Sequence, residues 1–136
     1  MKYKHGDKIV QDNKWFRSAS FLTFYSLFGI ACTFFYGLNN YRIHNRHNLS
    51  KVKKAITVSN HTMFLDPVLI SSAVFPYRTY QTLLEESVKA PFIGTLTRLL
   101  GGIPIPVNDQ NLNALYEGSM KALKKGKYLH FYPEGE

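Results

Sequence analysis

The chain has 136 residues, a length typical of one domain, and its 17 Lys and Arg against 9 Asp and Glu give a formal net charge of +8. Such a charge favours a polyanionic partner. Nucleic acid is excluded as that partner because no basic helix, no interleaving of aromatic and basic residues and no zinc-ligand spacing accompanies the charge. An anionic membrane surface is the more economical partner, although many of the lysines would serve solubility in any protein.

A long uncharged segment follows the basic N-terminal arm. Residues 18–41 carry no charge and lie between Arg17 and Arg42. About 20 apolar residues suffice to cross a bilayer, and this segment is apolar on all sides, which argues against an amphipathic surface helix. A cleaved signal peptide is disfavoured because the apolar region is too long and no small-x-small cleavage site follows it. The alternative is a buried core helix of a soluble protein.

Basic residues flank the apolar segment on both sides, so they do not define one orientation. Two arrangements fit: a helical hairpin that dips into one leaflet and bends near Gly29 or Gly37, or a single span whose C-terminal side is cytoplasmic. Both place the later part of the chain on the cytoplasmic face of the cell membrane. We therefore expect a basic arm with a membrane-associated segment over residues 1–41, followed by a domain over residues 42–136.

The sequence gives little sign of a disulfide or a metal site. Cys32 is the only cysteine and lies inside the apolar segment. His44 and His47 are three positions apart and can share a helix face, but no third ligand accompanies them. We expect neither a bound metal nor a disulfide.

Beyond Arg42, strand-like and helix-like segments alternate. Strands are expected at residues 55–59, 78–84 and 128–132, an extended segment at 103–107, and helices at 66–74, at 92–100 and from about 109 to 125. Gly101-Gly102 should stop the second helix, Asn108 or Asp109 should cap the third at its start, and Gly126 at its end. Prolines in the extended segment favour an edge of the sheet. The alternation predicts an α/β fold with a mostly parallel sheet and flanking helices.

The first chemical signal is the run from Asn60-His61 to Asp66-Pro67 at a strand-to-helix junction. A carboxylate near an imidazole fixes its tautomer and stabilises its cation, which is what a general base needs to take a proton from a hydroxyl. A local explanation is also available. Asp66 is a favoured helix N-cap and Pro67 a favoured first helical residue, so Asp66 can both cap the helix and orient His61.

The second signal is Phe131-Tyr132-Pro133-Glu134-Gly135 at the end of the last expected strand. Sites in parallel sheets form beyond the carboxyl ends of strands. We therefore expect Glu134 and Gly135 to face the same cleft as His61. Glycine at this position would let the backbone approach a bound molecule closely.

In this order the two motifs resemble the NHxxxxD and FPEG motifs of the phospholipid/glycerol acyltransferase family, lysophosphatidic acid acyltransferases in particular, over roughly residues 38–136. The resemblance implies that His61 is the general base for the acceptor hydroxyl and that Asp66 positions it. It also implies a substrate-binding set: Asn60, Lys89, Arg98, Pro133, Glu134 and Gly135.

The chain departs from the family pattern at two places. An arginine that holds the acceptor phosphate falls at Val107, and a valine cannot make a charge-assisted bond to phosphate. The third block normally continues with threonine and arginine, whereas here Glu136 follows Gly135. The resemblance thus implies a chain truncated after this block, with Lys89 or Arg98 as substitute phosphate anchors.

The implied reaction moves an acyl group from acyl-CoA or acyl-carrier protein to 1-acylglycerol 3-phosphate (lysophosphatidic acid), giving phosphatidic acid without a cofactor or an acyl-enzyme. Backbone N–H groups near Gly135 or at the helix start after His61 would stabilise the oxyanion. Two alternatives stay open. One is a non-catalytic, membrane-associated fragment, and the other is an enzyme for another lysophospholipid or for glycerol 3-phosphate.

Overall fold

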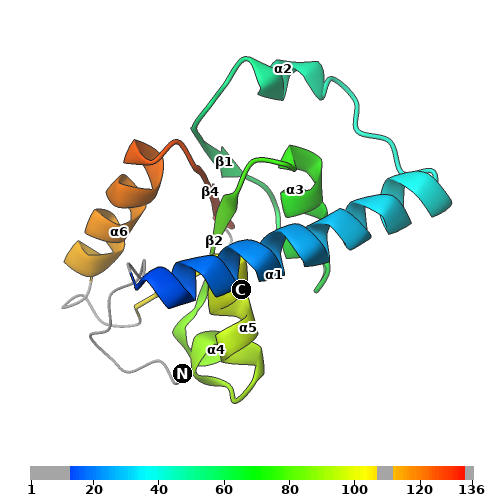
Figure 1. The fold of residues 1–136 in the computed structure, drawn as a ribbon. Coiled ribbons are helices and arrows are strands. Elements are labelled where there is room, and N and C mark those ends of the chain that lie inside the picture. Colours follow the sequence, from blue (N-terminus) through cyan, green and yellow to red (C-terminus); the bar gives the residue numbers. More distant parts are fainter. Residues whose placement is uncertain (1–12, 107–111, 134–136) are drawn as a thin grey trace.

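The computed structural model describes residues 13–106 and 112–133, and a four-stranded sheet lies at its centre (Figure 1). The strands are β1 (Ala55–Val58), β2 (Thr79–Leu84), β3 (Gly102–Ile105) and β4 (Tyr128–Phe131). Their order in the sheet is β1-β4-β2-β3, and all three neighbouring pairs are parallel. The predicted α/β class with a parallel sheet is confirmed.

Helices connect the strands over both faces of the sheet. They are α2 (His47–Ser50), α3 (Asp66–Val74), α4 (Glu85–Lys89), α5 (Ile93–Leu100) and α6 (Leu112–Lys124). The chain crosses the sheet in one direction from β1 to β2 to β3 and returns to β4. Because crossovers between parallel strands are right-handed, α3 and α5 cover one face and α6 covers the other, as Figure 1 shows.

The expected boundaries of the segment around Gly101 are confirmed. Gly101 ends α5 in the left-handed region, with φ 101°, and its N–H bonds to the Arg98 carbonyl. β3 pairs only with β2 in the described sheet, so Pro104 lies on an edge strand, where its missing N–H is tolerated. Asn108 and Asp109, the expected caps of α6, lie outside the described residues.

The N-terminal apolar segment is one continuous helix. α1 (Lys14–Cys32) begins where the Asn13 side chain accepts a bond from the Trp15 N–H, and it continues as a π-helical stretch, η1 (Thr33–Leu38). The chain passes through Gly29 and Gly37 without the bend that a hairpin requires. The hairpin arrangement was therefore wrong for this segment.

One side of α1 packs on α3 and α5. Phe24 and Phe28 are buried there, the Ser20 hydroxyl donates to the Leu99 carbonyl at 2.5 Å, and the Tyr25 hydroxyl donates to the Pro76 carbonyl at 3.1 Å. The hydroxyl contacts fix the helix on the domain because each links α1 to a residue far away in the sequence.

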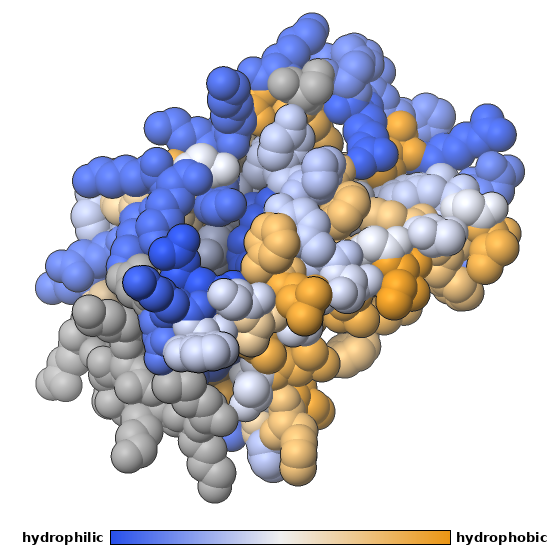
Figure 2. Space-filling model, in the orientation of Figure 1, coloured by the Kyte–Doolittle hydropathy of each residue, from blue (hydrophilic) through white to orange (hydrophobic). Residues whose placement is uncertain are grey.

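The other side of α1 is open. Residues 14–38 are long and apolar enough to cross a membrane by length and composition, and only 11% of their most apolar window is buried. The exposed apolar side chains include Phe21, Leu22 and Ile30, and Figure 2 shows an apolar band that follows α1 and continues over α5. Such exposure argues against the alternative of a buried core helix.

Close packing between α4 and α5 gives a test of the fold. A Cβ on Gly94 would lie 1.9 Å from the Val88 carbonyl oxygen, whereas a Cβ on Gly29 would meet nothing within 4 Å. Gly94→Ala should therefore lower the free energy of unfolding by about 1 to 3 kcal/mol, the range for overpacking. Gly29→Ala should be neutral or stabilising by up to about 1 kcal/mol. Thermal unfolding followed by circular dichroism measures both, and equal stabilities of the two variants would contradict the packing.

Candidate active site

Both sequence motifs emerge at one edge of the sheet. β1 and β4 are parallel neighbours, and Val58 pairs with Phe131 at their carboxyl ends. The chain that leads to His61 and the chain that leads to Pro133 therefore leave the sheet side by side. Glu134 and Gly135 lie outside the described residues, so their position in the same cleft stays a prediction.

A carboxylate oxygen holds the loop that carries His61. His61 Nδ1 lies 3.1 Å from Asp66 Oδ2, and the N–H groups of Thr62 and Met63 donate to that same oxygen at 2.6 and 2.8 Å. The expected hydrogen-bond contact between His61 and Asp66 is present. The expectation that Asp66 caps α3 was wrong, because α3 already includes Asp66 and its carboxylate bonds backward to the preceding loop.

These bonds determine the protonation of both side chains. The Met63 N–H bond, followed by the Thr62 and His61 bonds, lowers the pKa of Asp66 below its ordinary value of 3.8, against the opposing effect of burial. Asp66 is therefore ionised at neutral pH and can only accept. Nδ1 of His61 must then carry the hydrogen, which leaves Nε2 as the basic nitrogen. The His61 side chain is 32% exposed, so a reactant can reach it.

Tyr132 forms a wall beside His61. Its ring centre lies 4.6 Å from the His61 ring and 4.6 Å from the His130 ring, and its hydroxyl donates to Gln81 Oε1 at 2.8 Å. Burial and then the Asp66 charge raise the pKa of Tyr132, so its hydroxyl stays protonated and keeps donating. The Gln81 amide N–H group in turn donates to the Pro67 carbonyl, so Tyr132 is tied to the start of α3.

A second histidine lies beneath this edge. His130 is 1% exposed, and its two ring nitrogens lie 2.9 Å from Thr57 Oγ1 and 3.1 Å from Ser59 Oγ. Burial lowers the pKa of His130, so the ring is neutral at pH 7 and offers one donor and one acceptor. These bonds join β4 to β1 directly below the loop of His61.

Sequence reasoning gave no role to His130, Thr57 or Gln81, or to Tyr132 within its motif. A signal for them was available. Side chains two positions apart in a strand share a face, so His130 and Tyr132 on β4 face the same way as each other, and so do Thr57 and Ser59 on β1. Polar side chains repeated at this spacing on neighbouring strands indicate a bonded network.

The structure places the other predicted site residues in different surroundings. Asn60 is exposed beside His61, and Pro133 is exposed at the end of β4. Lys89 Nζ pairs with the buried Glu85 carboxylate at 3.1 Å after the carboxyl end of β2. Arg98 is not brought to His61. It is buried in a pocket with Arg78 and Lys127, which precede β2 and β4 at the opposite edge of the sheet.

The arrangement supplies a base and a polar wall. His61 Nε2 can take a proton from a hydroxyl, and Asp66 can stabilise the imidazolium that results. Among the residues that the structure describes, no group of three His, Cys, Asp or Glu side chains is arranged to hold a metal ion. Proton transfer is therefore the chemistry that this part of the site offers.

The bonds to Asp66 predict a pH-dependent contribution to stability. A carboxyl group whose pKa is lowered by folding stabilises the protein above its ordinary pKa, and that contribution disappears as the pH falls through the folded-state value. Asp66→Asn should lower the melting temperature at pH 7, and the difference from wild type should shrink as the pH falls below about 4. Glu86→Gln, an exposed control, should have no such effect. A difference that persists at pH 2 would contradict the role of the charge.

Comparison with known proteins identifies the family. The family model described as Acyltransferase matches residues 40–136, which is more than half of the chain and includes His61, Asp66 and Tyr132. No curated protein and no solved structure matches the chain. The matched region contains all four strands of the sheet and the whole of the edge described above. The chain belongs to the acyltransferase family.

Proposed function

We propose that this protein transfers a fatty acyl group from acyl-CoA or acyl-carrier protein to the hydroxyl of 1-acylglycerol 3-phosphate, forming phosphatidic acid for phospholipid synthesis. The observation that supports the proposal best is the bond of 3.1 Å between His61 Nδ1 and Asp66 Oδ2, on a loop inside the region of the family match. It leaves a basic nitrogen at an accessible edge of the sheet.

In the proposed reaction the acceptor hydroxyl attacks the thioester carbonyl carbon while His61 Nε2 takes its proton. The new C–O bond gives a tetrahedral oxyanion, and Asp66 stabilises the imidazolium. Collapse of the intermediate breaks the C–S bond, and the imidazolium returns the proton to the leaving thiolate. The products are an ester and a free thiol, and His61 regains its starting state. Proton transfer by a positioned side chain contributes about 10² to 10⁴ in rate.

The oxyanion needs donors that are not already used. The N–H groups of Thr62 and Met63 donate to Asp66, so they are engaged in holding the loop. We therefore propose that the backbone near Gly135 supplies donors, as the resemblance to the family implies. Tyr132 contributes by restricting the His61 ring, since the two rings lie 4.6 Å apart.

The acceptor phosphate requires a cation on the same edge as His61. We assign this role to Lys89, which follows the carboxyl end of β2 and whose side chain is 49% exposed. Its ammonium group has three donors, and the pair with Glu85 leaves donors for phosphate. The position of Arg98 at the opposite edge argues against the same role for that residue.

We propose that the open side of α1 lies in the membrane and that residues 42–136 face the cytoplasm. The acceptor and the product are membrane lipids, so an enzyme held at the bilayer meets both. The support is an exposed apolar surface on α1 together with basic residues on either side of it.

Loss of the base should abolish transfer. His61→Ala should lower the rate of acyl transfer from radiolabelled acyl-CoA to lysophosphatidic acid by at least about 100-fold. His44→Ala removes an exposed histidine outside the site, so that variant should keep the wild-type rate. A wild-type chain that transfers nothing would favour the non-catalytic alternative, and a His61→Ala variant with near wild-type activity would refute the assignment of the base.

The membrane assignment has a separate test. Wild-type protein should stay in the membrane fraction after a high-salt wash, because its attachment is apolar rather than electrostatic. Leu22→Lys with Ile30→Lys places two charges on the open side of α1 and should release much of the protein. Leu112→Lys with Tyr116→Lys makes the same change on exposed positions of α6 and should release none. Equal release of both variants would contradict a membrane role for α1.

A further inference from the structure

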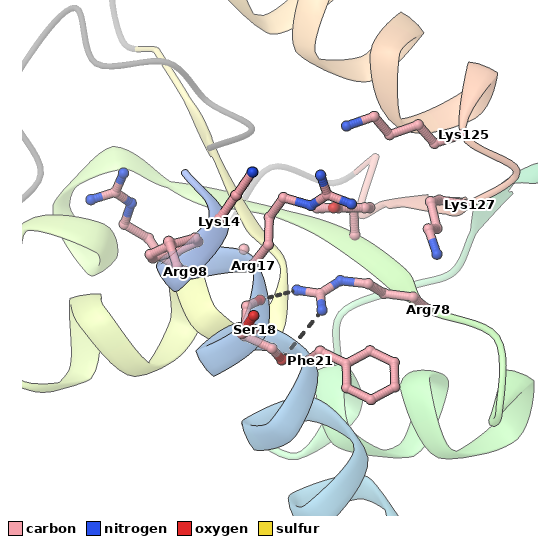
Figure 3. A pocket seen from close by; sticks show the side chains of 12 residues that line it. Lys14, Arg17, Ser18, Phe21, Arg78, Arg98, Lys125 and Lys127 are labelled. Carbon is pink, nitrogen blue, oxygen red and sulfur yellow. Dashed lines mark hydrogen bonds between the residues drawn. The ribbon is translucent and has the colours of Figure 1, made fainter. Parts of the chain in front are cut away.

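A second site lies at the amino-terminal edge of the sheet, away from His61. A pocket of about 560 Å³ opens between α1, the start of β2, α5 and the turn between α6 and β4 (Figure 3). This volume lies in the range of small-ligand pockets. Its cationic lining comes from separate parts of the chain: Lys14, Arg17, Arg78, Arg98, Lys125 and Lys127.

The positive charge of this pocket is not balanced by the described residues that line it, because none of them is Asp or Glu. Within the described chain, Arg17, Arg78 and Lys127 form no ion pair. The cations also act on one another. Burial, followed by the charges of Arg78, Lys125 and Arg17, lowers the pKa of Lys127. A bound anion would relieve this repulsion, which is the electrostatic condition for an anion site.

Arg78 is held rigidly at the floor of the pocket. Its guanidinium donates to the Ser20 carbonyl at 3.3 Å and to the Leu99 carbonyl at 2.9 Å, as part of the contact with α1 shown in Figure 3. It also lies 5.2 Å from the centre of the Phe24 ring and 5.3 Å from that of Tyr80. Its Nε is buried without a hydrogen-bond partner, which leaves a fixed donor unused.

The pocket is too far from His61 to hold the acceptor phosphate of the proposed reaction. Lys127 precedes β4 and Tyr132 follows it, a separation of about 16 Å at 3.3 Å per residue. In lysophosphatidic acid the hydroxyl and the phosphate are joined through a three-carbon glycerol unit, which cannot bridge this length. The pocket therefore belongs to a different ligand from the acceptor that reacts at His61.

We propose that this basic pocket binds the phosphate group of an anionic phospholipid head group. Lys14, Arg17 and Phe21 bring the first turns of α1 to the pocket, and the exposed apolar side of that helix begins at the same place. A head group in the pocket would leave its acyl chains beside Phe21 and Leu22, so charge and apolar surface are both matched by one lipid. The phosphates of coenzyme A carry the same chemistry, and the test separates the two sources.

The chain carries its own probe for this binding. Trp15 is the only tryptophan and lies next to Lys14. The purified full chain in neutral detergent micelles is titrated with phosphatidylglycerol or with phosphatidylcholine, and tryptophan fluorescence and native mass spectrometry report bound lipid. Wild-type protein should retain phosphatidylglycerol at least tenfold more strongly. Phosphatidylglycerol is neither acceptor nor product of the proposed reaction, and His61→Ala should bind it as wild type does, so this result is independent of the proposed function.

The variants avoid Arg78 because its bonds hold α1. Arg17→Gln with Lys127→Gln should weaken phosphatidylglycerol binding at least tenfold, since neither side chain makes a hydrogen bond within the described structure. Lys51→Gln with Lys53→Gln removes the same charge from an exposed stretch and should change binding less than twofold. Equal losses in both variants would show diffuse attraction and overturn the proposal. Coenzyme A binding that falls only in the pocket variant, with lipid binding unchanged, would also overturn it.

Discussion

One carboxylate oxygen determines the geometry of the candidate site. Oδ2 of Asp66 receives the N–H groups of Thr62 and Met63 and faces His61 Nδ1, so three donors from one short loop converge on a single atom. Hydrogen bonds to a charged acceptor are shorter and stronger than neutral ones. The loop is thereby closed on the first turn of α3, and the imidazole is oriented before any substrate arrives.

The sheet provides the rigid base for this loop. β1 and β4 end together, and the buried His130 joins them through Thr57 and Ser59. Tyr132 packs on both histidines and bonds to Gln81 on β2, so three neighbouring strands contribute to the same edge. A polar network in which each buried group has a partner stabilises one arrangement over its alternatives. His61 itself stays at the rim, where its basic nitrogen can be reached.

Much of the fold follows from sequence because its signals are local. The bounds of α3 agree with the expected 66–74, and the left-handed Gly101 ends α5 where glycine was expected to stop it. Other features depend on contacts that spacing cannot show. α4 is only five residues long and has no recognisable period. Whether the Asp66 carboxylate turns forward to α3 or back to His61 is decided by loop geometry. Arg98 is carried to the far edge by the turn that follows it, which a linear motif does not reveal.

The packing of α1 on α3 and α5 has a mechanical consequence. A membrane anchor joined by a loose linker lets its domain swing through a hemisphere above the bilayer. Here Ser20 and Tyr25 bond directly to the body of the domain, and Phe24 and Phe28 are buried in it. The anchor and the catalytic edge therefore move as one piece. With the open side of α1 in lipid, His61 would be held at a constant height above the surface, and its encounter with lipid acceptors would reduce to lateral diffusion in two dimensions.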